Sequence, residues 1–486
     1  MAKRMISRRE FIGGAVVGLG ALYGCSPRSL KRVVGANGDV RVAVVGVHGQ
    51  GNYHVELLRK TPGARVVALC DPDRAVLDKR LGEWAKEGGE YEGISDIRRL
   101  LDRKDIDAIS VAAPNHWHSL ATVWACQAGK DVYCEKPVSH DIWEGRKCVE
   151  AARKYGRIVQ TGTQKRSNAA IAEAFAWIKE GNLGKILWAR GLCYKRRDSI
   201  GKVDGPQKPP ASLDYDIWTG PAPLKPLMRK NLHYDWHWVW DTGNGDIGNQ
   251  GIHEMDLARW ALGVEGLPPR VLSFGGRFGY VDDGETANTQ VAFLDYPGAP
   301  LIFEVRGLPM EKGMEAMEPY RQVRIGYIIQ CEKGSFSGGD GGGTIFDNDN
   351  KVVRKFSGWG DESHFGNWLK AVRSRKVEDL NADIEKGHLS SALCHMGNIS
   401  YRLGKSVSPE EVSAAVNGNA EMKDSYGRMM AHLDKNGVDP KAAGITLGAA
   451  LEFDSTTEKF TGALAEPANA LAKREYRKPF VIPEQV

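Results

Sequence analysis

Residues 40–51, Val-Arg-Val-Ala-Val-Val-Gly-Val-His-Gly-Gln-Gly, join a short apolar run to a glycine-rich turn. Val40–Val45 has the length and the β-branched composition of a buried strand, and Asn52–Lys60 after the turn has a helical pattern. A strand that runs through such a turn into a helix is typical of a doubly wound parallel sheet. This stretch therefore decides the class of the first domain.

The alternation of strand and helix continues to about residue 163, as expected for a parallel sheet. It predicts an α/β Rossmann domain over residues 38–163. Further strands are predicted at Arg65–Leu69, Ala108–Ala112, Asp131–Cys134 and Arg157–Thr161, and further helices at Arg74–Lys86, Ser119–Ala128 and Asp141–Tyr155.

The pattern changes after residue 163 and predicts an α+β domain with a mostly antiparallel open sheet over residues 164–405. The glycine-rich segment Ser337–Gly343 is interpreted as a hairpin tip. Residues 406–486 form a mostly polar, partly helical C-terminal extension. The predicted strands are Ile186–Cys193, Val271–Phe274, Thr289–Phe293 and Leu301–Val305, and the predicted helices are Ala169–Glu180, Glu362–Ser374 and His388–Leu403, the last two returning to the first domain.

Residues 1–36 have the features of a twin-arginine export signal and linker. Arg8 and Arg9 precede an apolar, glycine-rich run that ends near Gly24 and is too short to span a membrane. Leu22–Ser26 resembles a lipobox, so Cys25 is a candidate lipid anchor, with removal of the signal as the alternative. We therefore expect an exported protein, either periplasmic or anchored to the outer side of the membrane.

The composition is that of a soluble globular protein of two domains plus extensions, with 486 residues, 42% hydrophobic and 26% charged. The net charge of +5, part of it at the N-terminus, gives no reason to expect nucleic-acid binding. Besides Cys25 the chain has seven cysteines without CxxC pairs, which argues against a disulfide framework and against a metal site.

The turn after the first strand resembles the dinucleotide fingerprint GxGxxG. Gly46 and Gly51 fill the first and third positions, whereas His48 stands in the second with Gly49 beside it. Asp71 ends the second predicted strand, where a carboxylate accepts hydrogen bonds from ribose hydroxyls and repels a ribose phosphate. The pattern predicts NAD as cofactor, with NADP disfavoured, although Arg74 lies nearby.

Two further stretches, Val111–His118 and Ala128–Pro137, resemble the signatures of the Gfo/Idh/MocA oxidoreductases, which include glucose–fructose oxidoreductase and inositol dehydrogenase. The Glu-Lys-Pro segment is the most specific part, and the resemblance covers roughly residues 38–405. It implies that Pro114, Asn115 and His118 line the nicotinamide end of the cofactor and that Glu135 helps to hold the dinucleotide. It also implies that Lys136 lies at the reacting carbon, where a lysine made less basic by burial can exchange a proton with a hydroxyl.

A second motif, Asn249–Asp256, resembles the substrate-domain motif Asp-x-Gly-x-His-x-x-Asp of the same family. Gly251, His253 and Asp256 match, and Asn249 replaces the first aspartate. His253 is the second candidate proton carrier or hydroxyl ligand. Asn249 can orient a hydroxyl but cannot act as a base, so our hypothesis is that Lys136 and His253 suffice for proton transfer.

The aromatic stretch Tyr234–Asp241 suits a pyranose, which needs apolar ring contact and hydroxyl partners. His237 is its best polar candidate for substrate binding, although core packing explains each tryptophan as well. Gln164 and Arg166 are further candidates, with capping or surface roles as the alternative. His364 and His388 are weaker ones.

These features favour an NAD-dependent dehydrogenase or reductase of a sugar, polyol or glycoside. An alternative is an NAD-dependent glycosidase that oxidises a hydroxyl transiently, eliminates the glycoside and returns the hydride. A third is a non-catalytic exported carbohydrate-binding protein, since fold alone does not imply activity. We expect a homo-oligomer formed through an exposed face of the second sheet, and a tightly held or externally regenerated cofactor.

Overall fold

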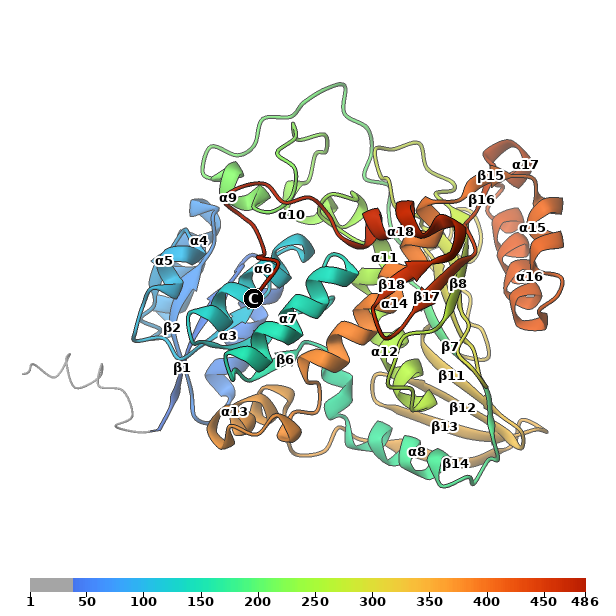
Figure 1. The fold of residues 1–486 in the computed structure, drawn as a ribbon, viewed down its shortest axis with the longest axis horizontal. Coiled ribbons are helices and arrows are strands. Elements are labelled where there is room, and N and C mark those ends of the chain that lie inside the picture. The colour runs from blue at the N-terminus through green and yellow to red at the C-terminus, as the bar shows by residue number, and fades with distance from the viewer. Residues whose placement is uncertain (1–37) are drawn as a thin grey trace, which may run out of the picture.

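Six parallel strands form the sheet of the first domain, with helices on both faces (Figure 1). The computed structural model describes residues 38–486, so the predicted signal and Cys25 lie outside the described residues. In spatial order the strands are β3 (Glu92–Ile94), β2 (Ala64–Cys70), β1 (Val40–Val45), β4 (Ala108–Val111), β5 (Asp131–Cys134) and β6 (Val159–Thr161). The helices are α3 (Gln50–Lys60), α4 (Arg74–Lys86), α5 (Ile97–Leu101), α6 (Asn115–Gln127) and α7 (Ile142–Lys154).

The first strand occupies the place that its sequence predicts. All six residues of β1 are buried, and β1 lies between β2 and β4, so the strand order reverses beside it. In an open α/β sheet, ligands bind outside the carboxyl ends of the strands at such a reversal. The glycine-rich turn after β1 is therefore at the expected ligand site.

Two details of the first domain differ from the sequence prediction. The short elements β3 and α5 were not predicted, because three and five residues are too few to show a periodicity. Helix α6 begins at Asn115 instead of Ser119, directly after Pro114, which takes the N-cap position. The predicted nicotinamide-side residues therefore lie at the N-terminal end of a helix.

The second domain is built on a 12-stranded sheet whose neighbours are antiparallel except for the parallel pair β7–β10. The predicted fold class is thus confirmed. Its main path is, in spatial order, β14 (Val352–Ser357), β13 (Gly342–Asp347), β12 (Gly334–Gly339), β11 (Ile325–Cys331), β7 (Ile186–Tyr194), β10 (Leu301–Arg306), β9 (Thr289–Leu294), β8 (Arg270–Gly276), β16 (Ile445–Leu447) and β15 (Lys405–Val407), with β17 (Leu451–Asp454) between β8 and β18 (Lys459–Thr461).

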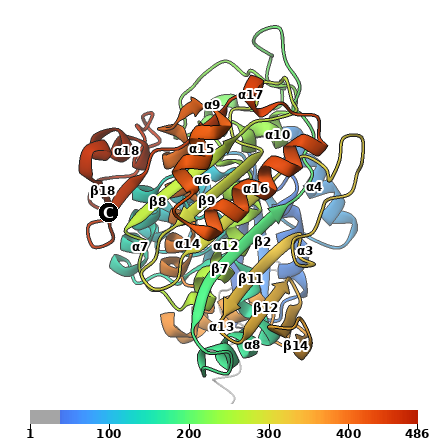
Figure 2. The same ribbon diagram turned by 90° about the vertical axis from the view of Figure 1, so that its right-hand side faces the viewer.

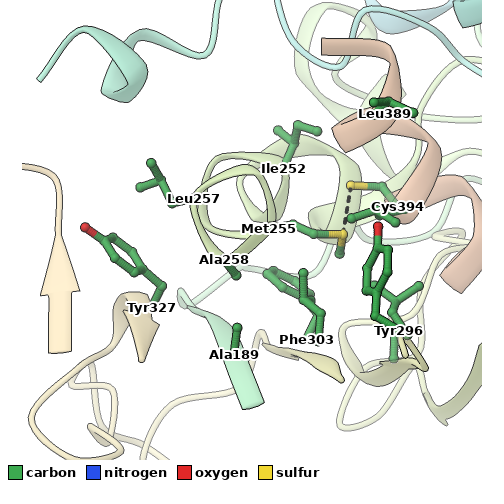
Figure 3. Packing of buried hydrophobic residues seen from close by; sticks show 14 of the residues in the cluster. Ala189, Ile252, Met255, Leu257, Ala258, Tyr296, Phe303, Tyr327, Leu389 and Cys394 are labelled. Atoms are coloured by element: carbon green, nitrogen blue, oxygen red, sulfur yellow. Dashed lines mark hydrogen bonds between the residues drawn. The ribbon is translucent and has the colours of Figure 1, made fainter. Parts of the chain in front are cut away.

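Helix α12 (Gly251–Leu262) connects this sheet to helix α14 (Ile384–Arg402). Its buried residues pack against Ala189 and Phe303 of the sheet on one side, and Met255 meets Cys394 of α14 on the other, with 3.9 Å between the sulfur atoms (Figure 3). Because α14 also packs on α7 of the first domain, α12 has a fixed position relative to both domains. Helices α8 (Ala169–Lys179) and α11 (Gly245–Asn249) lie on this side of the sheet, whereas α13 (His364–Ser374) packs in the core of the first domain, as the sequence predicted.

The C-terminal extension is part of both domains. Helices α15 (Pro409–Val416) and α16 (Ala420–Lys435) cover the sheet face opposite α12, as Figure 2 shows. The face that we expected to be exposed for oligomerisation is therefore covered in part by the chain itself. Helix α18 (Ala465–Ala472) and a tail follow, and the tail residues Phe480, Ile482 and Val486 are buried in the core of the first domain.

A buried ionic cluster fixes α16 on the sheet. Glu304 of β10 accepts hydrogen bonds from Arg190 of β7 (2.7 Å) and from Ser425 of α16 (2.8 Å), and it pairs with Arg428 of α16. Burial opposes ionisation of Glu304, but the charges of Arg190 and Arg428 hold the pKa of this carboxyl below its usual range. Since removal of one partner would leave a buried charge uncompensated, this cluster makes the position of α16 specific.

Within residues 38–486 no helix is long and apolar enough to cross a membrane. The seven cysteines in this range are free and buried, where a thiol packs as a small apolar group. The described part of the chain also brings together no group of three His, Cys, Asp or Glu side chains that could hold a metal ion.

Candidate active site

A cavity of about 360 Å³ lies between the carboxyl ends of the first sheet and residues 217–249 of the second domain. We call residues 212–237, which cover the cavity and include α9 (Tyr215–Thr219) and α10 (Leu232–Asp235), the roof. Most of the predicted site residues line this cavity. They are Gly46, His48, Gly49, Asp71, Pro114, Asn115, His118, Glu135, Lys136, His237 and Asn249.

The glycine-rich turn leaves room for a phosphate group. A Cβ atom at Gly46 would lie 2.8 Å from Cα of Ala113, and one at Gly51 would lie 1.8 Å from the carbonyl oxygen of Gly46. These two glycines are therefore required by packing of the protein itself. A Cβ atom at Gly49 would meet nothing within 4 Å, and no side chain caps the N-terminus of α3. The open backbone at Gly49 and the free helix N-terminus fit a pyrophosphate.

Asp71 lies where a ribose is expected. Its carboxylate accepts hydrogen bonds from the backbone N–H groups of Val47 (2.9 Å) and Asp73 (3.0 Å), and burial raises its pKa. Each oxygen keeps lone-pair capacity for a ribose hydroxyl. Arg74 pairs with Asp78 (2.9 Å) and does not line the cavity, so it offers no support for a ribose phosphate.

His48, the departure from the fingerprint, is directed towards the roof. Its ring stacks on His233, with 4.8 Å between ring centroids, and His233 in turn contacts the carboxylate of Asp73 (2.9 Å). Burial, together with the charges of His233 and Arg80, lowers the pKa of His48. The imidazole thus contacts protein instead of filling the space beside Gly49. His233 has no sequence motif and was not predicted.

A tryptophan pair holds the other part of the roof. The carbonyl oxygen of Trp218 accepts hydrogen bonds from Nε1 of Trp117 (2.9 Å) and faces Nε2 of His116 (3.0 Å). Gly220 lies so close to Trp117 that a Cβ atom there would be 2.4 Å from the indole. Trp117 and Trp218 both line the cavity, so these contacts connect its floor to its roof.

Glu135 organises the polar floor of the cavity. Its carboxylate accepts hydrogen bonds from Gln50 (3.1 Å) and from the backbone N–H of Lys136 (3.1 Å), and it contacts His54 (3.0 Å). Burial would raise the pKa of Glu135, but the hydrogen bond and charge of His54, with the charge of Lys136, lower it to about 2. Glu135 is therefore an anion that positions Gln50 and Lys136.

Lys136 lies on the cavity wall with its ammonium group aimed at the second domain. Nζ donates to the backbone carbonyl oxygen of Asn249 (3.1 Å). Burial lowers the pKa of Lys136, and the charges of Lys195 and Arg197 lower it further, against an opposing effect of Glu135 and Glu254. A lysine that loses its proton more readily can accept one from a substrate hydroxyl.

His253 lies behind the cavity wall. It is buried on α12, does not line the cavity, and its Nδ1 has no hydrogen-bond partner among the described residues. Burial and the charges of Lys136 and Lys165 lower its pKa well below the usual value. Asn249 ends α11 one turn earlier and does line the cavity, so the structure separates these two motif residues.

Four predicted or candidate residues do not reach the cavity. The guanidinium of Arg166 forms paired hydrogen bonds to Asp256 (both 2.8 Å), and Gln164 is exposed. His364 contacts the carbonyl oxygen of Thr161 (2.8 Å), and His388 contacts Glu458 (2.9 Å). The expected contact of Gln164 and Arg166 with a ligand in this cavity is thus corrected, because backbone direction at this turn, which the sequence does not reveal, aims both side chains elsewhere.

Aromatic side chains of the roof form part of the cavity wall. Trp236 stacks on His237 with 3.6 Å between ring centroids, and Tyr234 lies beside them. Burial, with the charges of Lys136 and Arg197, lowers the pKa of His237 to about 3, so this ring is neutral. An aromatic wall with a neutral imidazole suits a ring that carries hydroxyl groups.

Comparison with known proteins identifies both domains. The family description "Oxidoreductase family, NAD-binding Rossmann fold" (GFO_IDH_MocA) matches residues 40–163, and "Oxidoreductase family, C-terminal alpha/beta domain" matches residues 187–276. Scyllo-inositol 2-dehydrogenase (NAD(+)) of Bacillus subtilis is 31% identical over 155 residues, which are 32% of this chain and 44% of that protein. Levoglucosan dehydrogenase of Pseudarthrobacter phenanthrenivorans is 27% identical over 212 residues, 44% of this chain and 46% of that protein.

A third relative, 2,7-anhydro-N-acetylneuraminate hydratase of Mediterraneibacter gnavus, is 25% identical over 258 residues, 52% of this chain and 58% of that protein. The chain thus spans about half the length of these curated relatives. Among solved structures, the WlbA dehydrogenase from Bordetella pertussis in complex with NADH and UDP-GlcNAcA shares the fold, with a TM-score of 0.53, 19% identity and coverage of 73% of this chain and 94% of that one. The two domain matches, together with the open turn at Gly49 and the Glu-Lys-Pro segment at Lys136, show that the chain belongs to the Gfo/Idh/MocA oxidoreductase family and contains its NAD-binding Rossmann domain.

Proposed function

We propose that this protein is an NAD-dependent oxidoreductase that acts on a hydroxyl-bearing carbon of a sugar, polyol or glycoside. The observation that carries the proposal is the position of Lys136, whose Nζ lies on the wall of a cavity that joins the phosphate-binding turn to the aromatic roof. The named relatives that act on inositol and levoglucosan support the substrate class. Asp71 and the distant Arg74 support NAD over NADP.

The residues of the site divide the work of such a reaction. Gly49 and the N-terminus of α3 bind the pyrophosphate, and Asp71 binds the adenosine ribose. NAD, when bound, supplies the acceptor for the hydride that leaves the carbinol carbon. Lys136 takes the hydroxyl proton on Nζ, which donates to the carbonyl oxygen of Asn249, while Glu135 holds the backbone of Lys136 by accepting from its N–H. His253 is the second candidate proton carrier, acting from behind the wall.

The substrate ring is placed by the roof. Trp236 and His237 offer a flat aromatic surface and a neutral ring nitrogen, and Tyr234 offers a hydroxyl group. A closed roof also excludes water from the reacting carbon, which strengthens electrostatic interactions inside the cavity. We further propose export by the twin-arginine route and assembly into a homo-oligomer, with Cys25 as a possible lipidation site.

The test is to incubate the purified protein with NAD and a panel of sugars, polyols and glycosides, following NADH absorbance and product masses together. We expect net NADH and a product lighter by two hydrogens. Lys136→Met should abolish turnover and keep NAD binding, because Gly49 and Asp71, the proposed pyrophosphate and ribose contacts, are unchanged. Unchanged turnover in Lys136→Met would refute the role of this lysine, and NAD binding without any turnover would favour a carbohydrate-binding protein.

An NAD-dependent glycosidase is the second candidate. One relative is named a hydratase, and this name describes a reaction without net oxidation or reduction of the substrate. Glycosidic cleavage without accumulation of NADH in the same panel would favour this alternative.

A further inference from the structure

A second cavity of about 180 Å³ lies behind the wall of the active-site cavity. It is formed where α14, residues 240–244 and α18 meet, so it depends on the C-terminal extension. Its volume is below the roughly 300–1,000 Å³ of sites for drug-sized ligands, which suits a single ring.

The two cavities are separate. Asn244 stands between them: its side chain accepts a hydrogen bond from Asn115 of the first cavity (3.1 Å) and donates one to the carbonyl oxygen of His140 of the second (3.0 Å). Its backbone carbonyl oxygen accepts a hydrogen bond from Asn398 of α14 (2.8 Å). A ligand of the second cavity would therefore contact the outer side of this asparagine wall.

Two of the charged side chains that line the second cavity have ion-pair partners within the protein. Asp241 pairs with Lys225 (2.6 Å), and Arg474 pairs with Glu144 (2.6 Å). The guanidinium of Arg402 lies 5.0 Å from the ring centroid of Trp240. Because the charges of Asp241 and Arg474 are already compensated by these pairs, a small ion would gain little from either of them.

The indole ring of Trp240 lines the second cavity and is surrounded there by hydrogen-bonding groups. Trp240 is fixed by its backbone N–H, which donates to Glu285 (2.6 Å), and by Arg402. Arg474 keeps a buried Nη1 without a partner in the described part of the chain, which leaves donor capacity in its guanidinium group. An aromatic face, an amide at Asn398 and further donors form the chemistry that recognises a neutral polyhydroxylated ring.

We propose that the second cavity binds one neutral saccharide ring, independently of the ring that reacts at Lys136. Saccharide binding in the second cavity does not depend on the proposed oxidation, because the residues that line this cavity differ from those that line the active-site cavity. It can receive either a free sugar or one unit of a longer glycan, since both offer the same ring.

The test uses methyl glucoside, methyl galactoside and methyl mannoside as probes in ligand-observed NMR titrations. The protein is the full chain with NAD bound and two substitutions. Lys136→Met prevents turnover, and Trp236→Ala removes the aromatic contact in the first cavity. We expect at least one probe to bind the double variant. Adding Trp240→Ala should weaken that binding about tenfold, because it removes the aromatic contact.

Ala470→Phe is a second variant for the case that Trp240→Ala does not fold. Ala470 is exposed and lines the second cavity, so phenylalanine there should obstruct it with no loss of a core contact. Repeating the titration with a tetrasaccharide distinguishes the two sources of the ring. Tighter binding of the tetrasaccharide indicates a glycan, and tighter binding of the methyl glycoside indicates a free sugar. Binding that survives both Trp240→Ala and Ala470→Phe, or no binding of any probe, would overturn the proposal.

Discussion

Replacement of Phe480 by alanine tests whether the C-terminal tail supports the active-site cavity. Phe480 is 1% exposed in the core of the first domain and contacts Trp117 edge to face, with 5.6 Å between ring centroids. Loss of a buried phenylalanine side chain costs about 3–5 kcal/mol of unfolding free energy. Trp117 lines the cavity and donates to the roof at Trp218, so its displacement should also affect the cofactor.

The size of that second effect follows from one hydrogen bond. A bond such as Trp117–Trp218 contributes about 0.5–1.5 kcal/mol, so its loss should weaken NAD binding roughly two- to tenfold. Urea unfolding followed by tryptophan fluorescence measures the first effect, and equilibrium NAD titration measures the second. Both are expected in Phe480→Ala.

Phe460→Ala is the matched control. Phe460 is 2% exposed and contacts Phe453 edge to face in the core of the second domain, so the same truncation should cost a similar free energy far from Trp117. NAD affinity should then be unchanged. Equal loss of NAD affinity in both variants, or none in Phe480→Ala, would refute the argument that the tail supports the roof.

Three further predictions concern the cavity itself. The oxidation rate should rise with pH as Lys136 loses its proton, and the midpoint of the pH–rate profile should lie below the ordinary lysine pKa of 10.5. Lys195→Met removes a positive neighbour and should raise this midpoint, whereas Glu254→Gln removes a negative neighbour and should lower it. Opposite or absent movements would exclude these electrostatic effects. His233→Ala should release NAD faster in stopped-flow measurements, with an unchanged rate counting against the roof contact. Asn249→Asp should change the rate and its pH profile, and identical profiles would show that our hypothesis about this asparagine is wrong.

The regular parts of the fold could be predicted because their sequence has a period. The buried strand Val40–Val45 and the helix Arg74–Lys86 have the predicted bounds, since the apolar residues follow the spacing of each element. The extension after residue 406 was predicted only to be mostly polar and partly helical. Its strands pair with β8 and its tail enters the first core, because pairing partners far along the chain leave no local signal.

The position of a site residue could be predicted where a sequence motif fixes the backbone. It could not be predicted where the direction of the side chain decides whether the residue reaches the cavity. Lys136 and Asn249 meet as two motifs of different domains predict. Arg166 was expected in the cleft but is bound by Asp256, and His233 was missed. The roof consists of short helices and irregular segments, whose course depends on contacts made only in the folded chain.

Contacts with the roof explain how His48 can occupy a position where the dinucleotide fingerprint has a glycine. A second glycine in the fingerprint keeps side-chain atoms away from the pyrophosphate. Here the His48 ring is held by His233, and Asp73, next to the glycine-rich turn, holds His233 and Ser212 of the roof (2.9 and 2.8 Å). The turn and the roof therefore form one connected unit around the cavity. Because the glycine-rich turn belongs to that unit, we expect the His48–His233–Asp73 contacts to slow the release of a bound cofactor.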